Sequence, residues 1–464
     1  MGVLLELGRV LGLLQDFSQA NRVFTRLLKI SDRKNQPILL AKIAELSQDF
    51  VDQTVAGSAF ARAATHGSVD LLAKYAEFEL KHRNNEKARN LVERALEANP
   101  KYPYALLIKA RLLREGGCAS EALQLLENIS DSGDIPSRVK AAYEKGQILD
   151  LLGDYDSAYN AFLEAKKPLM TYRQKAIHIR QLSRETFNEI AQCLTQRQVD
   201  RWRSEQLDRG GSSYNIALLG GHPRSGTTLL EQILMSHSAV NSTDETENFN
   251  IFAYSRVMNK TSERNALKAF DSLSNAAGAR LRTDYLRAVR RSLVKEGDFE
   301  YWIDKNPSLT AIAPLLLRIL PEIKFIVVNR DPRDVILSCF MQCFYPLDTI
   351  PANYLTLADA ADEYCGVIRN WKTFAAFLGD SVCEVNYGDI VHDLPSVSRR
   401  VLSFMGLDWS PDVLRFNELS KDRIVRSKTA FDVTRNIHSN SIGRWKNYEK
   451  HFGPAIDKLI PVMD

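Results

Sequence analysis

The sequence predicts an α-helical array followed by an α/β domain with a parallel sheet. Glycine and proline are sparse over the first 200 residues, where apolar residues recur at helical spacing. From Tyr214 the pattern changes to a β-rich apolar run, a glycine-bearing turn and an amphipathic helix, which together form one α/β unit. We expect the array over residues 1–203, a polar linker over 204–213 and the second domain over 214–464.

Composition excludes several classes of protein. With 464 residues, 45% of them apolar and 25% charged, the chain has the balance of an ordinary globular protein of two or three domains. A net charge of +4 gives no polybasic arm for nucleic acid. Six cysteines without a CxxC pair argue against a disulfide framework or a zinc site, and we expect no metal.

The first segment, MGVLLELGRVLGLL, is apolar but is interrupted by Glu6 and Arg9. It has neither the basic start nor the small-residue cleavage site of a signal peptide, and we expect an amphipathic helix. No run approaches the roughly 18 apolar residues that a bilayer crossing needs. The expectation is therefore no membrane span and a cytoplasmic location.

A repeat of 34 residues runs through the helical region. Ala20, Thr54, Ala88 and Ala122 follow one another at steps of 34, and Ala158 follows after 36. Small residues allow two antiparallel helices to approach closely, and residues four and seven further on share the same helix face. Those face positions are held by Phe24, Val92, Leu126 and Phe162 at four residues, and by Leu27, Ala61, Ala95, Ile129 and Ala165 at seven.

This spacing resembles tetratricopeptide repeats, which implies an α-solenoid of about five units. The alternative is a non-repetitive helical bundle. Solenoids of this kind present a concave face to peptides or partner proteins, so the resemblance implies a binding surface and says little about chemistry.

The turn after the first strand has the spacing of a phosphate-binding loop. Gly221 to Thr228 have the spacing of GxxxxGK[ST], in which backbone N–H groups and a helix N-terminus hold phosphate. Thr227 stands where the lysine of that motif reaches the β and γ phosphates, which argues against hydrolysis of ATP or GTP and against a P-loop kinase. Arg224 on the turn can supply positive charge instead.

The segment PRSGTTLL within this loop resembles the 5′-phosphosulfate-binding loop of sulfotransferases. Residues 325–340 resemble the 3′-phosphate-binding segment of that family, and residues 381–391 resemble the strand whose tyrosine lies near adenine. Residues 439–454 resemble the closing segment of sulfotransferases that carry N-terminal tetratricopeptide repeats and are similar to tyrosylprotein sulfotransferases. The resemblance implies a P-loop-like α/β sulfotransferase domain.

The donor implied by this resemblance is 3′-phosphoadenosine 5′-phosphosulfate, with no metal required. It needs two anion sites, one at the loop and one at Arg330 with Ser338, and charge-assisted hydrogen bonds suit both. By similarity, Ser427 and Arg435 close over the 3′-phosphate. The full set assigned to the donor is Arg224, Ser225, Gly226, Thr227, Thr228, Arg330, Ser338, Tyr387, Ser427 and Arg435.

Sulfuryl transfer, like phosphoryl transfer, proceeds in line through a loose transition state, so positioning and cations do most of the work. A phenol acceptor with a pKa of about 10 also needs a base near neutral pH. By similarity to tyrosylprotein sulfotransferases, Glu245 is that base, with Asp244 beside it. Lys305 precedes a proline-started helix, and its ammonium is expected to stabilise the bridging oxygen between phosphorus and sulfur.

These expectations describe a sulfotransferase that uses this donor and acts on a protein tyrosine. Two alternatives stay open: a sulfotransferase for a carbohydrate or small-molecule hydroxyl, and a non-catalytic scaffold that binds a nucleotide or a partner. The expected partner is a protein or peptide acceptor bound partly by the repeat array, with no nucleic acid and a homodimer as an option.

Overall fold

The computed structural model describes residues 1–14, 16–34, 36–48, 50, 53–66, 68–127, 129, 134–205, 215–295, 297–343, 351–419 and 439–463. The chain divides into two compact units. The first unit comprises Met1–Gln174 and Phe340–Thr356, and the second comprises Lys175–Cys339 and Leu357–Asp464.

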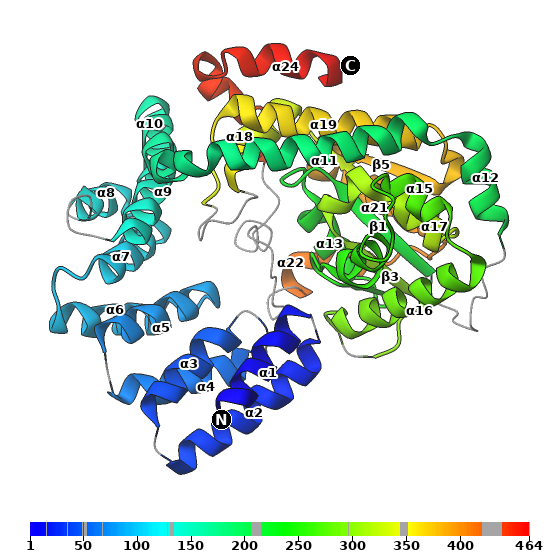
Figure 1. Ribbon diagram of the computed structural model, residues 1–464. Coiled ribbons are helices and arrows are strands. Elements are labelled where there is room, and N and C mark those ends of the chain that lie inside the picture. The colour runs from blue at the N-terminus through cyan, green and yellow to red at the C-terminus, as the bar shows by residue number, and fades with distance from the viewer. Residues whose placement is uncertain are drawn as a thin grey trace. The chain divides into compact units, whose positions relative to one another are not determined.

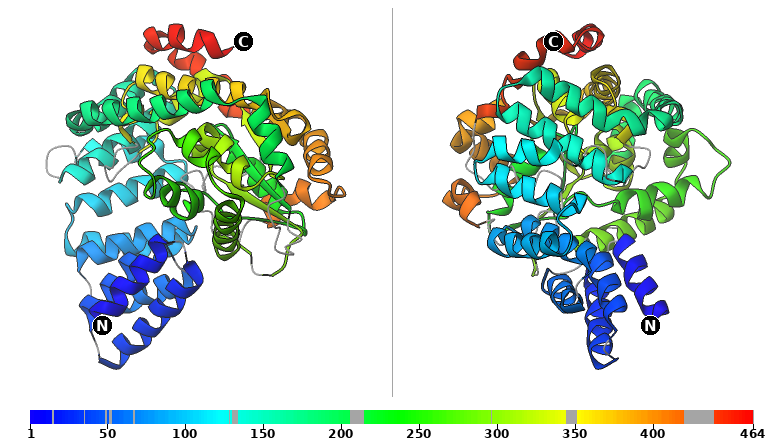
Figure 2. Two further views of the ribbon diagram at one scale, coloured as in Figure 1. Left: turned by 45° about the vertical axis from the view of Figure 1, so that its right-hand side comes forward. Right: turned by 90° about the vertical axis from the view of Figure 1, so that its left-hand side faces the viewer.

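Five helical hairpins make up the first unit within the described ranges, and Figures 1 and 2 show them following one another in chain order. This confirms the predicted helical array. The hairpins pair α1 (Gly2–Leu13) with α2 (Phe17–Lys34), α3 (Pro37–Ser47) with α4 (Gln53–Ala63), α5 (Val69–Lys81) with α6 (Asn85–Ala98), α7 (Pro103–Glu115) with α8 (Ala119–Glu127), and α9 (Ile135–Leu151) with α10 (Tyr155–Lys166).

The repeat register places small residues at the helix contacts in four of these hairpins, where Ala20, Ala88, Ala122 and Ala158 are fully buried. The second hairpin departs from the prediction, because Thr54 is exposed. There Ala56 takes the small position, and Phe60 and Ala63 follow it at four and seven residues, all three buried. The register of this hairpin therefore begins two residues later, since a branched polar side chain does not suit a close helix contact.

A five-stranded parallel sheet organises the second unit, as predicted, with the order β2-β3-β1-β4-β5. Its strands are β1 (Asn215–Gly221), β2 (Val240–Ser242), β3 (Tyr301–Lys305), β4 (Lys324–Asn329) and β5 (Val382–Asn386). Its helices in the described ranges are α11 (Arg173–Cys193), α12 (Gln196–Ser204), α13 (Thr227–Met235), α14 (Ser255–Met258), α15 (Ala266–Asp271), α16 (Asn275–Ser292), α17 (Ala313–Ile319), α18 (Pro332–Phe340), α19 (Leu357–Ala375), α20 (Tyr387–His392), α21 (Leu394–Met405), α22 (Phe416–Leu419) and α24 (Pro454–Met463).

Apolar cores cover both faces of the sheet, because successive side chains of a strand point to opposite faces. Ile216 and Leu218 of β1 belong to the core that includes residues of α12, α15 and α17. Ala217 and Leu219 belong to the core that includes residues of α13 and α21. A parallel sheet covered in this way gathers the carboxyl ends of its strands along one edge.

The helices α11 and α12 belong to the second unit, although the sequence assigns residues up to 203 to the array. Ile190, Val199 and Trp202 are buried in the same core as β1, and Arg180 forms a buried ion pair with Asp359 at 3.2 Å. The expected boundary at residue 203 thus differs from the compact units, because these helices bury their apolar residues against the sheet domain. Most of the expected linker, residues 206–213, lies outside the described residues.

A short segment from the second half of the sequence completes the first unit. The ring of Phe340 stacks on Tyr159 with 5.2 Å between centroids, and the ammonium of Lys166 lies 4.5 Å from the centre of the Phe340 ring. Gln147 donates a hydrogen bond to the carbonyl of Met341 at 3.2 Å. This segment therefore packs with the last hairpin rather than with the sheet.

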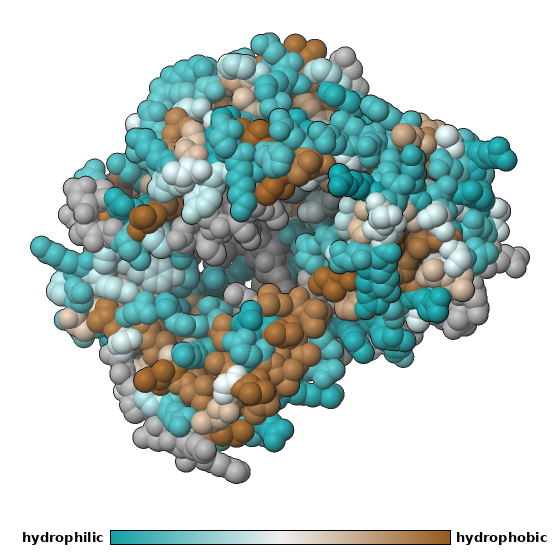
Figure 3. All heavy atoms as spheres, in the orientation of Figure 1, coloured by the Kyte–Doolittle hydropathy of each residue, from teal (hydrophilic) through white to brown (hydrophobic). Residues whose placement is uncertain are grey.

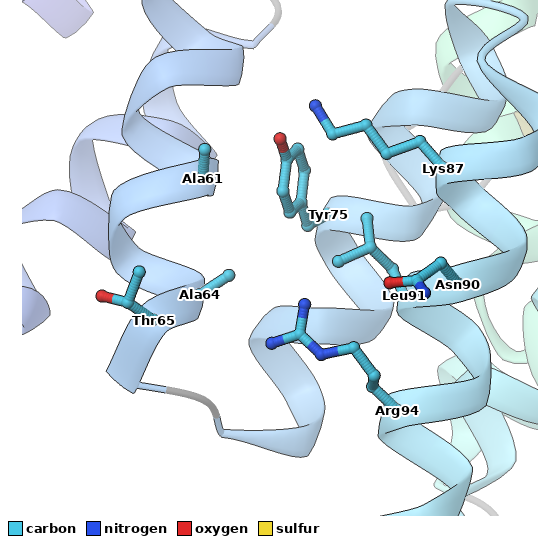
Figure 4. Close-up of a pocket in the computed structure, with 8 residues that line it drawn as sticks. All are labelled: Ala61, Ala64, Thr65, Tyr75, Lys87, Asn90, Leu91 and Arg94. Atoms are coloured by element: carbon cyan, nitrogen blue, oxygen red, sulfur yellow. The ribbon is translucent and has the colours of Figure 1, made fainter.

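The surface of the array has two notable features. Figure 3 shows apolar side chains gathered over the first helices, and the exposed ones on and just after α1 are Val3, Leu7, Val10, Leu13 and Leu14. A pocket of about 270 Å³ opens between α4 and α6 (Figure 4), lined by Ala61, Ala64, Thr65, Tyr75, Lys87, Asn90, Leu91 and Arg94. Among the helices in the described ranges, none combines the length and apolar character that crossing a bilayer requires.

Candidate active site

The loop between β1 and α13 depends on two glycines in left-handed conformations. Gly221 has φ 134° and Gly226 has φ 110°, angles that L-residues rarely adopt. A Cβ on Gly221 would lie 2.6 Å from the carbonyl oxygen of Val328, and a Cβ on Gly226 would lie 2.5 Å from the ring of Tyr387. Thr310 fixes the start of the loop by bonding both the N–H and the carbonyl of Gly221 at 2.8 Å.

The strand register brings the predicted catalytic and donor residues to this loop. Leu219 of β1 pairs with Lys305 on one side, and Gly221 pairs with Val328 of β4 on the other. Lys305 therefore ends β3 beside the loop, and Arg330 follows β4 beside it. This is the switch point of the sheet, where open α/β folds bind their ligands.

Lys305 is the centre of a buried acidic cluster. Its ammonium donates hydrogen bonds to Glu245 at 2.7 Å and Asp244 at 3.1 Å, and it lies 3.5 Å from a carboxylate oxygen of Glu231. The side chains of Lys305 and Glu231 have no exposed surface, whereas the side chain of Glu245 is 43% exposed. The cluster thus presents one acidic group to solvent and keeps its cation inside.

Backbone strain marks the same positions. Arg224, Asp244 and Glu245 have φ angles of 73°, 53° and 57°, and they are the only described non-glycine residues of the second unit in the left-handed region. Such conformations cost about 1–3 kcal/mol each and persist only where the surroundings impose them. The N–H of Glu245 bonds the carbonyl of Lys305 at 2.7 Å, which holds the strained turn to the end of β3.

The electrostatics of the cluster favour a charged lysine. Burial lowers the pKa of Lys305, but the carboxylates of Glu231, Asp244 and Glu245 raise it more, so its pKa is above the ordinary value. Burial raises the pKa of Glu231 to about 8, against the opposing effect of Lys305. The buried ammonium therefore stays protonated at neutral pH.

Arg224, Ser338 and Arg330 form the other half of the site. Arg224 donates to the hydroxyl of Ser338 at 3.0 Å, and Arg330 donates to the carbonyl of Arg224 at 3.0 Å. The Nε of Arg330 and the Oγ of Ser225 are buried and have no hydrogen-bond partner among the described residues. Burial lowers the pKa of Arg330, a cost that a bound anion would offset.

Tyr387 and the C-terminal segment, residues 439–454, complete the half of the site formed by Arg224, Ser338 and Arg330. The guanidinium of Arg330 lies 4.8 Å from the centre of the Tyr387 ring, and it also donates to the carbonyl of Ser441. Asp334 of α18 accepts hydrogen bonds from the N–H groups of Gly443 and Trp445 at 2.7 and 3.0 Å. The first part of residues 439–454, singled out in the sequence, is thereby held beside the predicted 3′-phosphate segment.

The structure brings most of the predicted site residues together. Ser225, Thr227 and Thr228 are buried around the start of α13, while Ser427 and Arg435 lie outside the described residues. His222, next to the loop, is buried against Tyr364 with 5.0 Å between ring centroids, and burial lowers its pKa to about 4. It is therefore neutral at pH 7 and shapes the turn.

Sequence reasoning missed Glu231 and Thr310. Glu231 lies one turn after Thr227 within the apolar run LLEQIL, and a charged residue inside a helix that is buried throughout was the available signal. Thr310 gives no such signal, because an isolated threonine in a 3₁₀ turn is ordinary.

Comparisons with known proteins show which families this chain resembles. Residues 217–411 match the sulfotransferase family, and residues 79–132 match a tetratricopeptide repeat. An uncharacterized protein of Aquifex aeolicus is 25% identical over 81% of this chain and 48% of its own length. Protein-tyrosine sulfotransferase 1 of Danio rerio is 23% identical over 50% of this chain and 65% of its own length.

Among solved structures, the sulfotransferase domain of the Synechococcus PCC 7002 olefin synthase has 20% identity and a TM-score of 0.36, covering 52% of this chain and 91% of that one. The chain spans about half the length of the Aquifex relative and under two thirds of the Danio relative.

Replacing Gly226 by alanine should damage the loop. The new Cβ would be strained at φ 110° and would lie 2.5 Å from the Tyr387 ring, so we expect a loss of about 1–3 kcal/mol in unfolding free energy. Thermal or denaturant unfolding measures this loss. The matched control is Gly388→Ala, because a Cβ there meets no atom within 4 Å. Equal behaviour of the two variants would contradict the role given to Gly226.

Proposed function

We propose that this chain, which contains a sulfotransferase-family domain and a tetratricopeptide repeat, transfers a sulfuryl group from 3′-phosphoadenosine 5′-phosphosulfate to an acceptor hydroxyl, with protein tyrosine as the first candidate. The observation that carries the proposal is Lys305, a buried ammonium paired with the partly exposed Glu245 beside a phosphate-type loop. A protein that only held a nucleotide would not need this pair.

The residues on both sides of the loop fit a donor with two anionic ends. The loop N–H groups, Ser225 and the start of α13 would hold the 5′ end, because a helix N-terminus and a free buried hydroxyl favour anions. Arg330 and Ser338 would hold the 3′-phosphate. Arg330 has a buried N–H without a partner among the described residues, which an anion would satisfy.

The chemistry then divides between two side chains. Glu245 would accept the proton of the acceptor hydroxyl while that oxygen forms a bond to sulfur and the bond from sulfur to the bridging phosphate oxygen breaks. The electron pair of the broken bond stays on the phosphate oxygen. Lys305 would stabilise this developing charge from a buried position, where electrostatic interactions are strong.

The repeat array would contribute to acceptor binding. The pocket in Figure 4 places Lys87, Asn90 and Arg94 of α6 around one hollow, opposite Ala61 and Ala64. Lys87 forms an ion pair with Glu79 at 2.7 Å. Arg94 is therefore the cation of this pocket that is best placed to bind an anionic group of an acceptor. An acidic stretch of a protein acceptor suits such a lining.

Two alternatives remain, and the same assays separate them. If the acceptor is a carbohydrate or another small molecule, transfer to it would not depend on the array. If the domain is a scaffold, nucleotide would bind and no label would move from donor to any acceptor.

Changing Glu245 to glutamine should separate binding from chemistry. The amide keeps the shape of the side chain but cannot take a proton, so turnover should fall roughly 10²-fold to 10⁴-fold while nucleotide affinity stays nearly constant. Steady-state kinetics with a phenolic acceptor and calorimetry with 3′-phosphoadenosine 5′-phosphate measure the two effects. Transfer at the wild-type rate near pH 7 would place the base elsewhere, with Asp244 the next candidate.

Changing Arg330 to alanine should weaken the binding of 3′-phosphoadenosine 5′-phosphate by about 1.5–3 kcal/mol. This is the usual contribution of a hydrogen bond to a charged group. ATP serves as the control ligand, because it has no 3′-phosphate and should bind poorly to both forms. Calorimetry on the full chain with each nucleotide decides the matter. Equal affinity of the wild type for ATP would refute the donor assignment.

Reversing charge in the pocket should affect acceptor binding alone. Arg94→Glu should raise KM for an acidic protein acceptor several-fold with kcat unchanged, because the pocket contributes binding and no catalytic group. Arg89→Glu is the matched control, since Arg89 is exposed on the same helix and does not line the pocket. If both variants raise KM equally, the effect is one of overall charge and the pocket is not the acceptor site.

A further inference from the structure

Glu231 is a buried acid whose surroundings are built around Lys305. It lies on α13, the helix that follows the phosphate loop, and has no exposed surface. One carboxylate oxygen accepts a hydrogen bond from the hydroxyl of Ser242 on β2. The other lies 3.5 Å from the Lys305 ammonium and has no hydrogen-bond partner among the described residues.

Asp304, the neighbouring buried acid on β3, shows what a structural carboxylate looks like here. Tyr285 donates to one of its oxygens and Thr243 donates to the other at 3.2 Å, so both oxygens are satisfied. Glu231 leaves one oxygen aimed at a cation instead. A buried carboxylate without full hydrogen bonding is costly, which indicates that its proximity to Lys305 serves a purpose.

The three acids around Lys305 have different exposure. Glu245 is 43% exposed and is the group that would turn to an acceptor, whereas Asp244 and Glu231 are buried. When Glu245 takes a proton it can no longer hold the ammonium as a carboxylate. The position of the Lys305 ammonium then depends on the two buried acids, Asp244 and Glu231.

We propose that Glu231 is a positioning residue that, together with Asp244, keeps the Lys305 ammonium at the phosphate loop while Glu245 engages the acceptor. The inference rests on the proposed sulfuryl transfer. The contact between Glu231 and Lys305 connects α13, which begins at the phosphate loop, to the end of β3. This one contact thereby sets the distance between the loop and the lysine.

This role has a signature in pH. The charged and titratable groups facing Glu231 are Lys305, Asp244 and Glu245, and the Ser242 hydroxyl also faces it. Burial raises its pKa to about 8 against the opposing effect of Lys305. Because a raised carboxyl pKa means protonation at lower pH, the carboxylate that attracts Lys305 forms as pH rises through about 8, and kcat should rise with it.

The test compares kcat over pH 6.5–9.5 for the full-length wild type, Glu231→Gln and Asp304→Asn, with 3′-phosphoadenosine 5′-phosphate affinity as the second readout. We expect an inflection near pH 8 in the wild type that Glu231→Gln abolishes, with kcat at pH 9 lower by roughly 10-fold to 100-fold, the equivalent of a lost contact to a charged group. Nucleotide affinity should not change. Asp304→Asn makes the same chemical change in a buried acid of β3 and should keep the inflection.

Each outcome has a separate meaning. No transfer by the wild type at any pH refutes the proposed function. Transfer by the wild type with an unaltered profile in Glu231→Gln refutes the positioning role alone. If Glu231→Gln does not fold, Ser242→Ala replaces it: loss of the hydroxyl that holds Glu231 should lower kcat and move the inflection, and an unchanged profile overturns the inference.

Discussion

The burial of one ammonium group at the carboxyl end of β3 is the constraint on which the site depends. Removing a lysine from water is expensive, and it is tolerated here because three acidic side chains, Glu231 from α13 and Asp244 and Glu245 from the turn after β2, converge on Lys305. To bring its two acids to Lys305, the turn adopts a strained backbone conformation at Asp244 and Glu245. The positions of Lys305, the strained turn and α13 therefore depend on one another. A substitution in any one of them should displace the other two.

The second half of the site is held by contacts of a different kind. Arg330 bonds backbone carbonyls of the loop and of the C-terminal segment and stacks on Tyr387, which in turn lies against Gly226. Because Asp334 anchors residues 443 and 445 through their N–H groups, the C-terminal segment is part of the same arrangement. Cations and backbone dipoles dominate this half, whereas carboxylates dominate the half around Lys305. The division suits a reaction in which an anionic donor meets a hydroxyl that must lose a proton.

Much of this arrangement could be predicted from sequence because it depends on local pattern. The small-residue register located four of the five hairpins, and the loop spacing located the strand, turn and helix. The two-residue shift at Thr54 could not be predicted, because the period alone does not show which residue of a helix meets its neighbour. Nor could the placement of α11, α12 and Phe340, since a periodic apolar pattern does not reveal which core buries a segment. Glu231 was missed because its meaning depends on Lys305, more than 70 residues away in sequence.

The most direct measurement is the fate of sulfur from a donor labelled with ³⁵S and incubated with the full-length protein and a tyrosine-containing acidic peptide. The proposed chemistry predicts label in the peptide, stable to mild base as an aryl sulfate is, with one molecule of 3′-phosphoadenosine 5′-phosphate released for each label transferred. Tight binding of that nucleotide, with no label in the peptide, in a carbohydrate acceptor or in any component of a cell lysate, would contradict it. The domain would then hold a nucleotide without transferring sulfur.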